Sequence, residues 1–263
     1  MLTFEPLPQA FFQAEQAPAR LSTVYQKLSL LRAAGVDLVW LMRFGQEFAS
    51  LGAREFVQQV LVDDLAGTCI VVGEDFRFGR GRSGNNDSLQ EFGKEMGFSV
   101  ETVAAVQSAG QRISSSGIRH MLAAGDFAAA EEWLGRPFRM EGHVVRGAQL
   151  GRQLGFPTAN LKIRAHPSPL QGVFAVFARK AGGHWHAAVS NLGWRPVVNG
   201  REPLLEVHFF DFDEDLYGQR LEVQFVAKLR DELDFESIEE LVVQMKRDET
   251  EARLCLAQVI MPE

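Results

Sequence analysis

The spacing of apolar residues changes near residue 135 of this 263-residue chain. Before that point, stretches with the 3.6-residue spacing of a helix alternate with short apolar runs that indicate buried strands. Beyond it, short strand-like segments follow one another, and apolar and polar side chains largely alternate over residues 221–229. Because a helix-covered sheet and a strand-only core bury their apolar faces differently, we expect two domains, for which the chain is long enough.

The first domain is predicted to be α/β with a doubly wound parallel sheet. Its helical and strand-like stretches alternate in the order 21–34, 36–42, 53–65 and 68–72. A turn-rich loop, residues 73–87, follows the last of these strands. Ligands of such sheets bind at the carboxyl ends of the strands, so this loop is a candidate ligand site.

Two short helices, residues 114–124 and 127–134, end this region, and Gly135 and Pro137 stop the second one. We place the domain boundary there. The predicted divisions are a first domain, a helical linker and a second domain, at residues 1–122, 123–136 and 137–263.

The second domain is predicted to be a closed antiparallel barrel, because its short strands follow one another without intervening helices. We expect these strands at residues 138–145, 172–180, 186–192, 203–211 and 221–229. One helix then ends the chain. Ser237 and Glu240 have the spacing of a capping box, and the apolar residues after them form one stripe that should pack on the barrel.

The overall charge limits the partners. The formal net charge is −7 and the pI is near 5.5, which argues against a nucleic acid or an anionic membrane as the main partner. Cys69 and Cys255 lie far apart in strand-like and helix-like segments, as expected of buried free thiols in a reducing compartment. No signal peptide or membrane span is recognisable, so we expect a cytoplasmic protein.

A cluster of glycines precedes Thr158 and Asn160. Gly147 and Gly151 would let backbone amides approach an anionic ligand, although barrel turns and bulges also use glycine. Thr158 and Asn160 lie two apart on an extended segment, so they point the same way and would suit a magnesium ion already bound to phosphates. The alternative, that they form a turn after Pro157, is about equally good from the residues alone.

Glu206 lies in a strand-like run, residues 204–210, whose two faces are both largely apolar. A charge there is costly unless it has a partner or faces a cavity, and partial desolvation would raise its affinity for a proton, as a general base requires. It could instead be a charge that protects an edge strand from aggregation. His208 is an alternative base, although a lone histidine on an apolar strand is more often a hydrogen-bonded packing residue.

On these residues, the chain resembles the bacterial bifunctional riboflavin kinase/FAD synthetase family. Six motifs carry the resemblance in the second half: Gly142 to Gly147, Gly155 to Asn160, Asn191 to Pro196, Leu205 to His208, Asp211 to Gly218, and Leu229 to Glu232. Three carry it in the first half: Thr3 to Pro6, Val72 to Gly79, and Ile113 to Arg119. The resemblance implies a Rossmann-like nucleotidyltransferase domain and a six-stranded antiparallel β-barrel with a C-terminal helix.

The resemblance also implies roles for the site residues. Thr158 and Asn160 would hold Mg²⁺ and ATP, the glycine-bearing loop would cover the phosphates, and Glu206 would deprotonate the ribityl 5′-hydroxyl of riboflavin. The flavin would lie between the barrel and the C-terminal segment. The implied binding residues are Gly147, Gly151, Arg152, Pro157, Thr158, Asn160 and, as a wall of the flavin site, Arg230.

One feature of the family is not found in the first half. Its adenylyltransferase domain begins with a strand and a glycine-rich turn bearing two histidines, whereas the histidines of this chain lie at 120, 143, 166, 184, 186 and 208. Without that central strand, two apolar edges would lack partners. We therefore hypothesise that Met1 lies inside the family's second strand and is not the natural start. Asp75, Arg77, Ser115 and Arg119 would be remnants of a nucleotide site.

The resulting expectation is a riboflavin kinase that makes FMN from riboflavin and ATP, with FMN adenylyltransferase activity impaired or lost. The alternative is a fully bifunctional enzyme that makes both FMN and FAD. A non-catalytic flavin-binding module is a third reading, against which Thr158, Asn160 and Glu206 argue. The sequence does not indicate the oligomeric state.

Overall fold

The computed structural model describes residues 1–147, 149–163, 167–197 and 200–262, without the side chains of residues 195–202. Arg195 and Pro196 of the sequence motifs therefore lie outside the described side chains. The chain forms two compact units. The α/β unit comprises Met1–Ala17 and Leu30–Ile113, and the barrel unit comprises Pro18–Ser29 and Ser114–Glu263.

The α/β unit contains two separate two-stranded parallel sheets within the described residues. Strand β1 (Leu2–Glu5) pairs with β2 (Trp40–Arg43), and β3 (Cys69–Gly73) pairs with β4 (Ser99–Val103). No described strand joins β1 to β3. Both sheets are parallel and helices lie between their strands in the sequence, as expected of an α/β domain.

Short helices accompany these sheets. They are α1 (Pro8–Phe12), the 3₁₀ turn η1 (Ala14–Gln16), α3 (Gln46–Ser50), α4 (Ala53–Phe56), its wider continuation η2 (Val57–Asp64), the 3₁₀ turn η3 (Arg80–Arg82) and α5 (Asn86–Met96). A small hairpin, β5 (Gln107–Ser108) and β6 (Gln111–Arg112), follows β4. The apolar core gathers where η2, α5 and the loop after β3 meet, at Phe56, Val57, Val60, Leu61, Phe78, Leu89 and Phe98.

Both cysteines are free, as predicted, but the predicted burial of Cys69 is wrong. Cys69 and Val71 lie on one face of β3, and Val71 is 57% exposed. That face is apolar in sequence, and no described element covers it fully. An apolar run therefore indicated the strand correctly and its burial incorrectly.

The barrel unit is a closed six-stranded antiparallel barrel with strand order β10-β11-β8-β7-β12-β9. Its strands are β7 (Arg139–Val145), β8 (Ala159–Ile163), β9 (Gly172–Lys180), β10 (His186–Val197), β11 (Gly200–Phe209) and β12 (Arg220–Arg230). Alternate residues of each strand point inward, which closes the core around side chains such as Leu161, Phe174, Leu192 and Leu205. The expected barrel is confirmed; β8 is the strand that the pattern did not predict, because it is only five residues long.

Helices α6 (Ser115–Ala124) and α7 (Phe127–Leu134) belong to the barrel unit. Ile118, Leu122, Phe127 and Ala130 join the barrel core, so the segment expected to be a linker is packed on the barrel. Helix α2 (Val24–Ala33) crosses the division between the two units, and a short helix, α8 (Leu150–Gln153), precedes β8.

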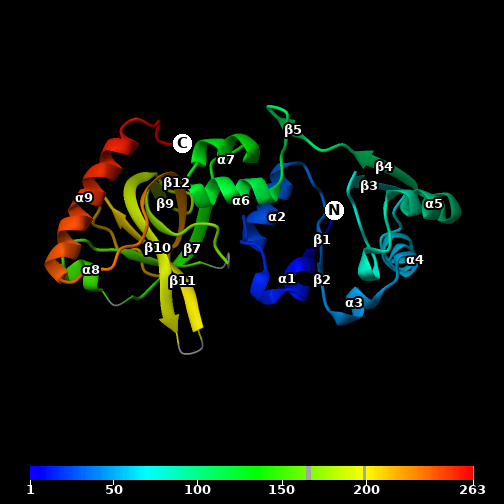
Figure 1. The fold of residues 1–263 in the computed structure, drawn as a ribbon, viewed down its shortest axis with the longest axis horizontal. Coiled ribbons are helices and arrows are strands. Elements are labelled where there is room, and N and C mark those ends of the chain that lie inside the picture. The colour runs from blue at the N-terminus through cyan, green and yellow to red at the C-terminus, as the bar shows by residue number, and fades with distance from the viewer. Residues whose placement is uncertain (148, 164–166, 198–199, 263) are drawn as a thin grey trace. The chain divides into compact units, whose positions relative to one another are not determined.

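The last helix, α9 (Ile238–Leu256), lies along the outside of the barrel (Figure 1). Ala252 and Leu256 pack against Phe177 and Phe210 of the barrel wall. Ser237 caps the helix by accepting a hydrogen bond from Glu240 N at 3.2 Å. Half of the predicted capping box is therefore present; Glu240 Oε2 accepts from Glu236 N instead of Ser237 N. In the described part of the chain, no helix is both long and apolar enough to cross a membrane.

Candidate functional site

A cavity of about 350 Å³ lies between the outer wall of the barrel and α9. This volume is within the range of small-molecule sites. The wall of β8, β10 and β11 forms one side, and α8, the segment after β12 and α9 form the others. Its polar lining includes Thr158, Asn160, Ser190, Asn191, Glu206, His208, Arg230, Glu232 and Asp248.

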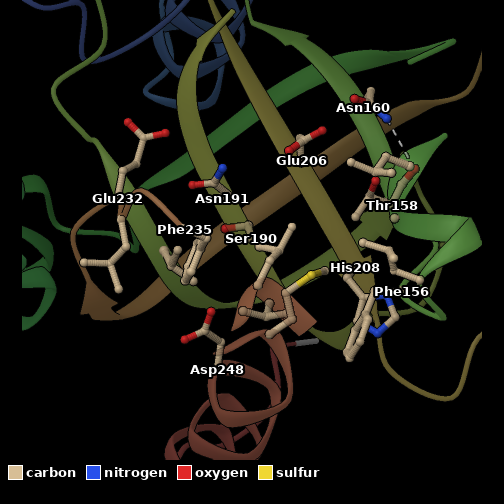
Figure 2. A pocket seen from close by; sticks show the side chains of 18 of the residues that line it. Phe156, Thr158, Asn160, Ser190, Asn191, Glu206, His208, Glu232, Phe235 and Asp248 are labelled. Carbon is tan, nitrogen blue, oxygen red and sulfur yellow. Dashed lines mark hydrogen bonds between the residues drawn. The ribbon is translucent and has the colours of Figure 1, made fainter. Parts of the chain in front are cut away.

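Three polar side chains form one row across the barrel wall. Glu206 on β11 is directly opposite Asn160 on β8 and directly opposite Asn191 on β10. Directly opposed residues point to the same face, with Cβ atoms about 5 Å apart. Figure 2 shows Glu206 between Asn191 and Asn160. The row therefore places a carboxylate between two neutral amides.

The row faces the cavity because its neighbours along the strands fill the barrel core. Leu205 and Val207, on either side of Glu206, are fully buried inside the barrel. Since successive strand residues point to opposite faces, Glu206 points outward into the cavity. The sequence showed two apolar faces around this glutamate, and the structure shows that one is the core and the other lies under α9.

Thr158, Asn160 and Glu206, the residues to which the sequence analysis gave the metal and the base, line this one cavity. Asn160 is 7% exposed, and its Nδ2 donates a long hydrogen bond of 3.4 Å to the carbonyl oxygen of Thr158. That bond fixes the amide so that its Oδ1 is turned away from the Thr158 carbonyl. A threonine hydroxyl and an amide oxygen are hard oxygen donors of the kind that magnesium accepts.

The two glycines act by close packing inside the protein. A Cβ on Gly147 would lie 2.6 Å from the side-chain amide of Asn160, and a Cβ on Gly151 would collide with the carbonyl oxygen of Phe156. Real side chains do not approach this closely, so a Cβ would displace the Asn160 amide at position 147 and the backbone of Phe156 at position 151. The glycine loop, which carries Gly147 and Gly151, therefore packs directly against the segment that carries Thr158 and Asn160.

A second cavity, of about 210 Å³, shares Thr158 and Asn160 with the first. Arg152 and Pro157, both expected at the site, line it. Its other walls are an acidic turn and aromatic rings, at Phe209, Phe212, Asp213, Glu214, Asp215, Leu216 and Tyr217. Tyr217 is tied to the glycine loop, since its hydroxyl accepts a 3.0 Å hydrogen bond from Gln149 Nε2. Thr158 and Asn160 thus lie between two cavities.

Arg230 lines the first cavity, but its guanidinium is bound to protein atoms. Its Nε and Nη2 donate to the two carboxylate oxygens of Asp248 at 2.9 and 2.6 Å, and its Nη1 donates to Asp231 O at 2.9 Å. Gln244 Nε2 donates to Asp248 as well, at 2.9 Å. Arg230 therefore fastens the end of β12 to α9 and so fixes that wall of the cavity.

The four residues expected to be remnants of a nucleotide site fall in different units. Asp75 and Arg77 lie in the loop after β3 of the α/β unit, where Arg112 donates to Asp75 at 2.6 Å and lowers the pKa of that carboxyl. Ser115 and Arg119 lie on α6 of the barrel unit. Arg119 donates to Ala19 O, and burial lowers its pKa.

Asn191 and Asp248 are site residues that the sequence analysis missed. Asn191 Oδ1 is buried and accepts no hydrogen bond from any described residue. Its motif was noted, but only the register between β10 and β11 places it beside Glu206. Asp248 lies on the face of α9 toward the barrel, so the signal available was an acidic residue at a core-facing helical position.

Comparison with known proteins gives two matches that together cover most of the chain. The family model described as FAD synthetase matches residues 1–117, and the one described as Riboflavin kinase matches residues 134–256. Their boundaries lie close to the division between the two units.

Several similar proteins carry the name bifunctional riboflavin kinase/FMN adenylyltransferase. The protein of Pseudomonas fluorescens is 45% identical over 258 residues, which are 98% of this chain and 82% of that protein. The protein of Escherichia coli strain K12 is 43% identical over 253 residues, covering 96% of this chain and 81% of that protein. The protein of Haemophilus influenzae is 42% identical over 94% of this chain and 80% of its own length.

Among solved structures, one from Streptococcus pneumoniae titled as a macrolide-efflux protein matches with a TM-score of 0.77 and 29% identity. The match covers 96% of this chain and 82% of that chain. It thus includes the folds of both units.

Proposed function

The chain belongs to the bifunctional riboflavin kinase/FMN adenylyltransferase family, and on that premise we propose that its barrel unit transfers the γ-phosphate of ATP to the 5′-hydroxyl of riboflavin, giving FMN and ADP. The single observation that carries the proposal is the convergence of Thr158, Asn160 and Glu206 on one cavity. These three side chains supply the oxygen donors and the base that phosphoryl transfer to an alcohol requires.

In the proposed reaction, Glu206 accepts the proton of the 5′-hydroxyl as the alcohol oxygen attacks the γ-phosphorus. A new bond forms between that oxygen and phosphorus, and the bond from the γ-phosphorus to the bridging oxygen of ADP breaks. Asn191 lies next to Glu206 on the side away from Asn160. Its unpartnered Oδ1 is placed to accept a hydrogen bond from another hydroxyl of the ribityl chain and so to orient the alcohol.

Magnesium fits the donors that the cavity offers. Thr158 Oγ1 and Asn160 Oδ1 would hold the ion, and among the described residues no cluster of three histidine, cysteine or acidic side chains forms a dedicated metal cage. Mg²⁺ typically binds through few protein ligands and completes its shell with water and substrate phosphates. When bound, it would neutralise charge that develops on the transferred phosphate.

The two cavities divide the substrates in this proposal. The larger one, with Glu206 and Asn191, takes the flavin, and the smaller one, with Arg152 and the ring of Tyr217, takes the nucleotide. Thr158 and Asn160 line both cavities, which supports a triphosphate that crosses from one to the other beside them. The glycine loop is suited to the phosphates because Gly147 and Gly151 allow it to lie against this segment.

We propose adenylyl transfer from ATP to FMN as the second activity of the chain. The match to the FAD synthetase family over residues 1–117 supports it, as do relatives named for both activities that align with 94–98% of the chain. These findings favour the bifunctional alternative over the impaired activity that we expected from the histidine positions.

Incubation with riboflavin, ATP and magnesium, followed by chromatography of the flavins, tests both activities. FMN and FAD together support the full proposal, FMN alone supports the kinase only, and unchanged riboflavin contradicts the kinase. Glu206→Gln should keep flavin binding and slow FMN formation by about a hundredfold or more, as for a lost general base. Glu239→Gln, an equal charge change on the exposed first turn of α9, serves as the control. Near-normal turnover by Glu206→Gln would remove Glu206 from the role of base.

A further inference from the structure

His208 contacts the segment that carries Thr158, although the reaction proposed above gives it no part. It lies two residues beyond Glu206 on β11, so both side chains point to the same face. Its ring nitrogen Nδ1 is 2.9 Å from the carbonyl oxygen of Pro157. Figure 2 shows the ring beside Phe156, close to Thr158.

The chemistry of the partners fixes the direction of this hydrogen bond. A backbone carbonyl only accepts, so Nδ1 must carry the proton and donate it. Proline has no N–H group, so the carbonyl is the one hydrogen-bonding group that Pro157 offers.

The bond lies just past the end of the strand pairing. The pairing of β11 with β8 runs from Leu204 opposite Lys162 to Val207 opposite Ala159. Thr158 comes one residue before the first paired residue of β8. The contact from His208 to Pro157 therefore continues the attachment of this segment to β11 where the backbone ladder has stopped.

Two aromatic rings hold the imidazole in place. The ring of His208 packs edge to face against Phe156, with centroids 5.3 Å apart, and against Phe210, with centroids 6.0 Å apart. Both phenylalanines are buried. A ring held in this way loses little further freedom when it makes its hydrogen bond, so the bond positions its partner more effectively than a mobile side chain would.

We infer that His208 is a positioning residue of the proposed kinase: by holding the carbonyl of Pro157 it sets the place of the Thr158 hydroxyl relative to Glu206. The inference rests on the proposed function, because the position of the Thr158 hydroxyl matters only if Thr158 helps to bind the magnesium nucleotide. His208 itself needs no contact with either substrate for this role.

Two substitutions separate the hydrogen bond from the ring. In His208→Asn, the side-chain N–H lies as many bonds from the backbone as Nδ1 does, so the bond to Pro157 is kept. In His208→Leu, an apolar side chain fills much of the space and no donor remains. His208→Gln, with its donor one bond farther out, is a second variant without a well-placed donor in case the leucine protein does not fold.

The measurements are binding of Mg²⁺-ADP and of riboflavin by calorimetry, the melting-temperature shift caused by Mg²⁺-ADP, and kcat and KM for FMN formation. His208→Leu and His208→Gln should weaken Mg²⁺-ADP binding and raise KM for ATP about tenfold, the effect of one lost hydrogen bond. Riboflavin affinity, measured in the same variants, reports any direct effect on the larger cavity, which His208 also lines. His208→Asn should restore nucleotide binding to within about threefold.

The outcomes distinguish this inference from the proposed function. If the unaltered protein forms no FMN, the proposed function fails and the inference falls with it. If the unaltered protein forms FMN while His208→Leu and His208→Gln bind Mg²⁺-ADP normally, only the inference is overturned. It is also overturned if His208→Asn is as weak as His208→Leu, because the ring rather than the hydrogen bond would then matter.

Discussion

The buried pair of Arg230 and Asp248 offers a quantitative test of how the cavity wall is held. Asp248 on α9 is 4% exposed and accepts three hydrogen bonds, two from Arg230 and one from Gln244. Arg230 is the last residue of β12, and the segment after it carries Glu232 and Phe235 into the cavity lining. The pair therefore connects the start of this wall segment, at the end of β12, to α9.

Removing one partner leaves the other charged in a poorly hydrated site. Asp248→Leu and Arg230→Met should each lower the free energy of unfolding by about 3–5 kcal/mol, the usual cost of breaking a buried ion pair. The double variant replaces the pair with two apolar side chains of similar length. Because it leaves no unpaired charge, it should cost at least about 2 kcal/mol less than the sum of the two single changes.

Urea unfolding followed by tryptophan fluorescence measures these values. Of the four tryptophans, Trp133, Trp185 and Trp194 lie in the barrel unit and Trp40 in the α/β unit, so the signal reports mainly on the barrel. Riboflavin affinity, measured in parallel, should fall in the single variants because the wall loses its anchor. Additive effects of the two substitutions on stability would refute the argument, since they would show that the two charges do not depend on each other.

Two further predictions concern a glycine and an exposed ion pair. Gly147→Ala should weaken Mg²⁺-ADP binding about tenfold or more, because the new Cβ would lie 2.6 Å from the Asn160 amide. Calorimetry measures this binding, with Gly45→Ala as the control, because no atom lies within 4 Å of a Cβ built on Gly45. The hydrogen bond from Arg253 lowers the pKa of the Asp211 carboxyl. This pair therefore stabilises the fold above about pH 4, the pKa of an unfolded aspartate. The stabilisation is lost as the pH falls through the lower pKa of the folded state. Asp211→Asn should therefore be less stable than the unaltered protein at pH 7 and equally stable below the folded-state pKa of Asp211. Urea unfolding measures both proteins across this pH range, and a difference in stability that is constant with pH would contradict this role of the Arg253–Asp211 pair.

The barrel could be predicted from the sequence because its strands are apolar runs, either alternating or continuous, that follow one another without intervening helices. The expected strand at 172–180 is β9 as found, and the one at 138–145 differs from β7 by one residue. Strong alternation also revealed β12. The short β8 did not stand out, because five residues after a proline give too few repeats to show a period.

Contacts between segments far apart in the chain could not be predicted from the sequence. Asn191 is a neighbour of Glu206 only because β10 and β11 pair in one particular register. Asp248 meets Arg230 only because α9 packs on this side of the barrel. A local pattern fixes which face a residue occupies within its own strand or helix, whereas tertiary closure fixes which residues of other elements share that face.

The same register that closes the barrel also selects the residues of the site. A slip of β11 by one residue against β8 would bring Val207 opposite Asn160 and turn Glu206 into the core that Leu205 and Val207 now fill. That arrangement would bury a carboxylate among apolar side chains and expose two apolar ones, each at a cost of a few kcal/mol. The shifted register is therefore disfavoured by the burial of these side chains alone, without any contact with a substrate. The apolar residues on either side of Glu206 therefore hold the proposed base in the cavity as a consequence of folding, before any ligand binds.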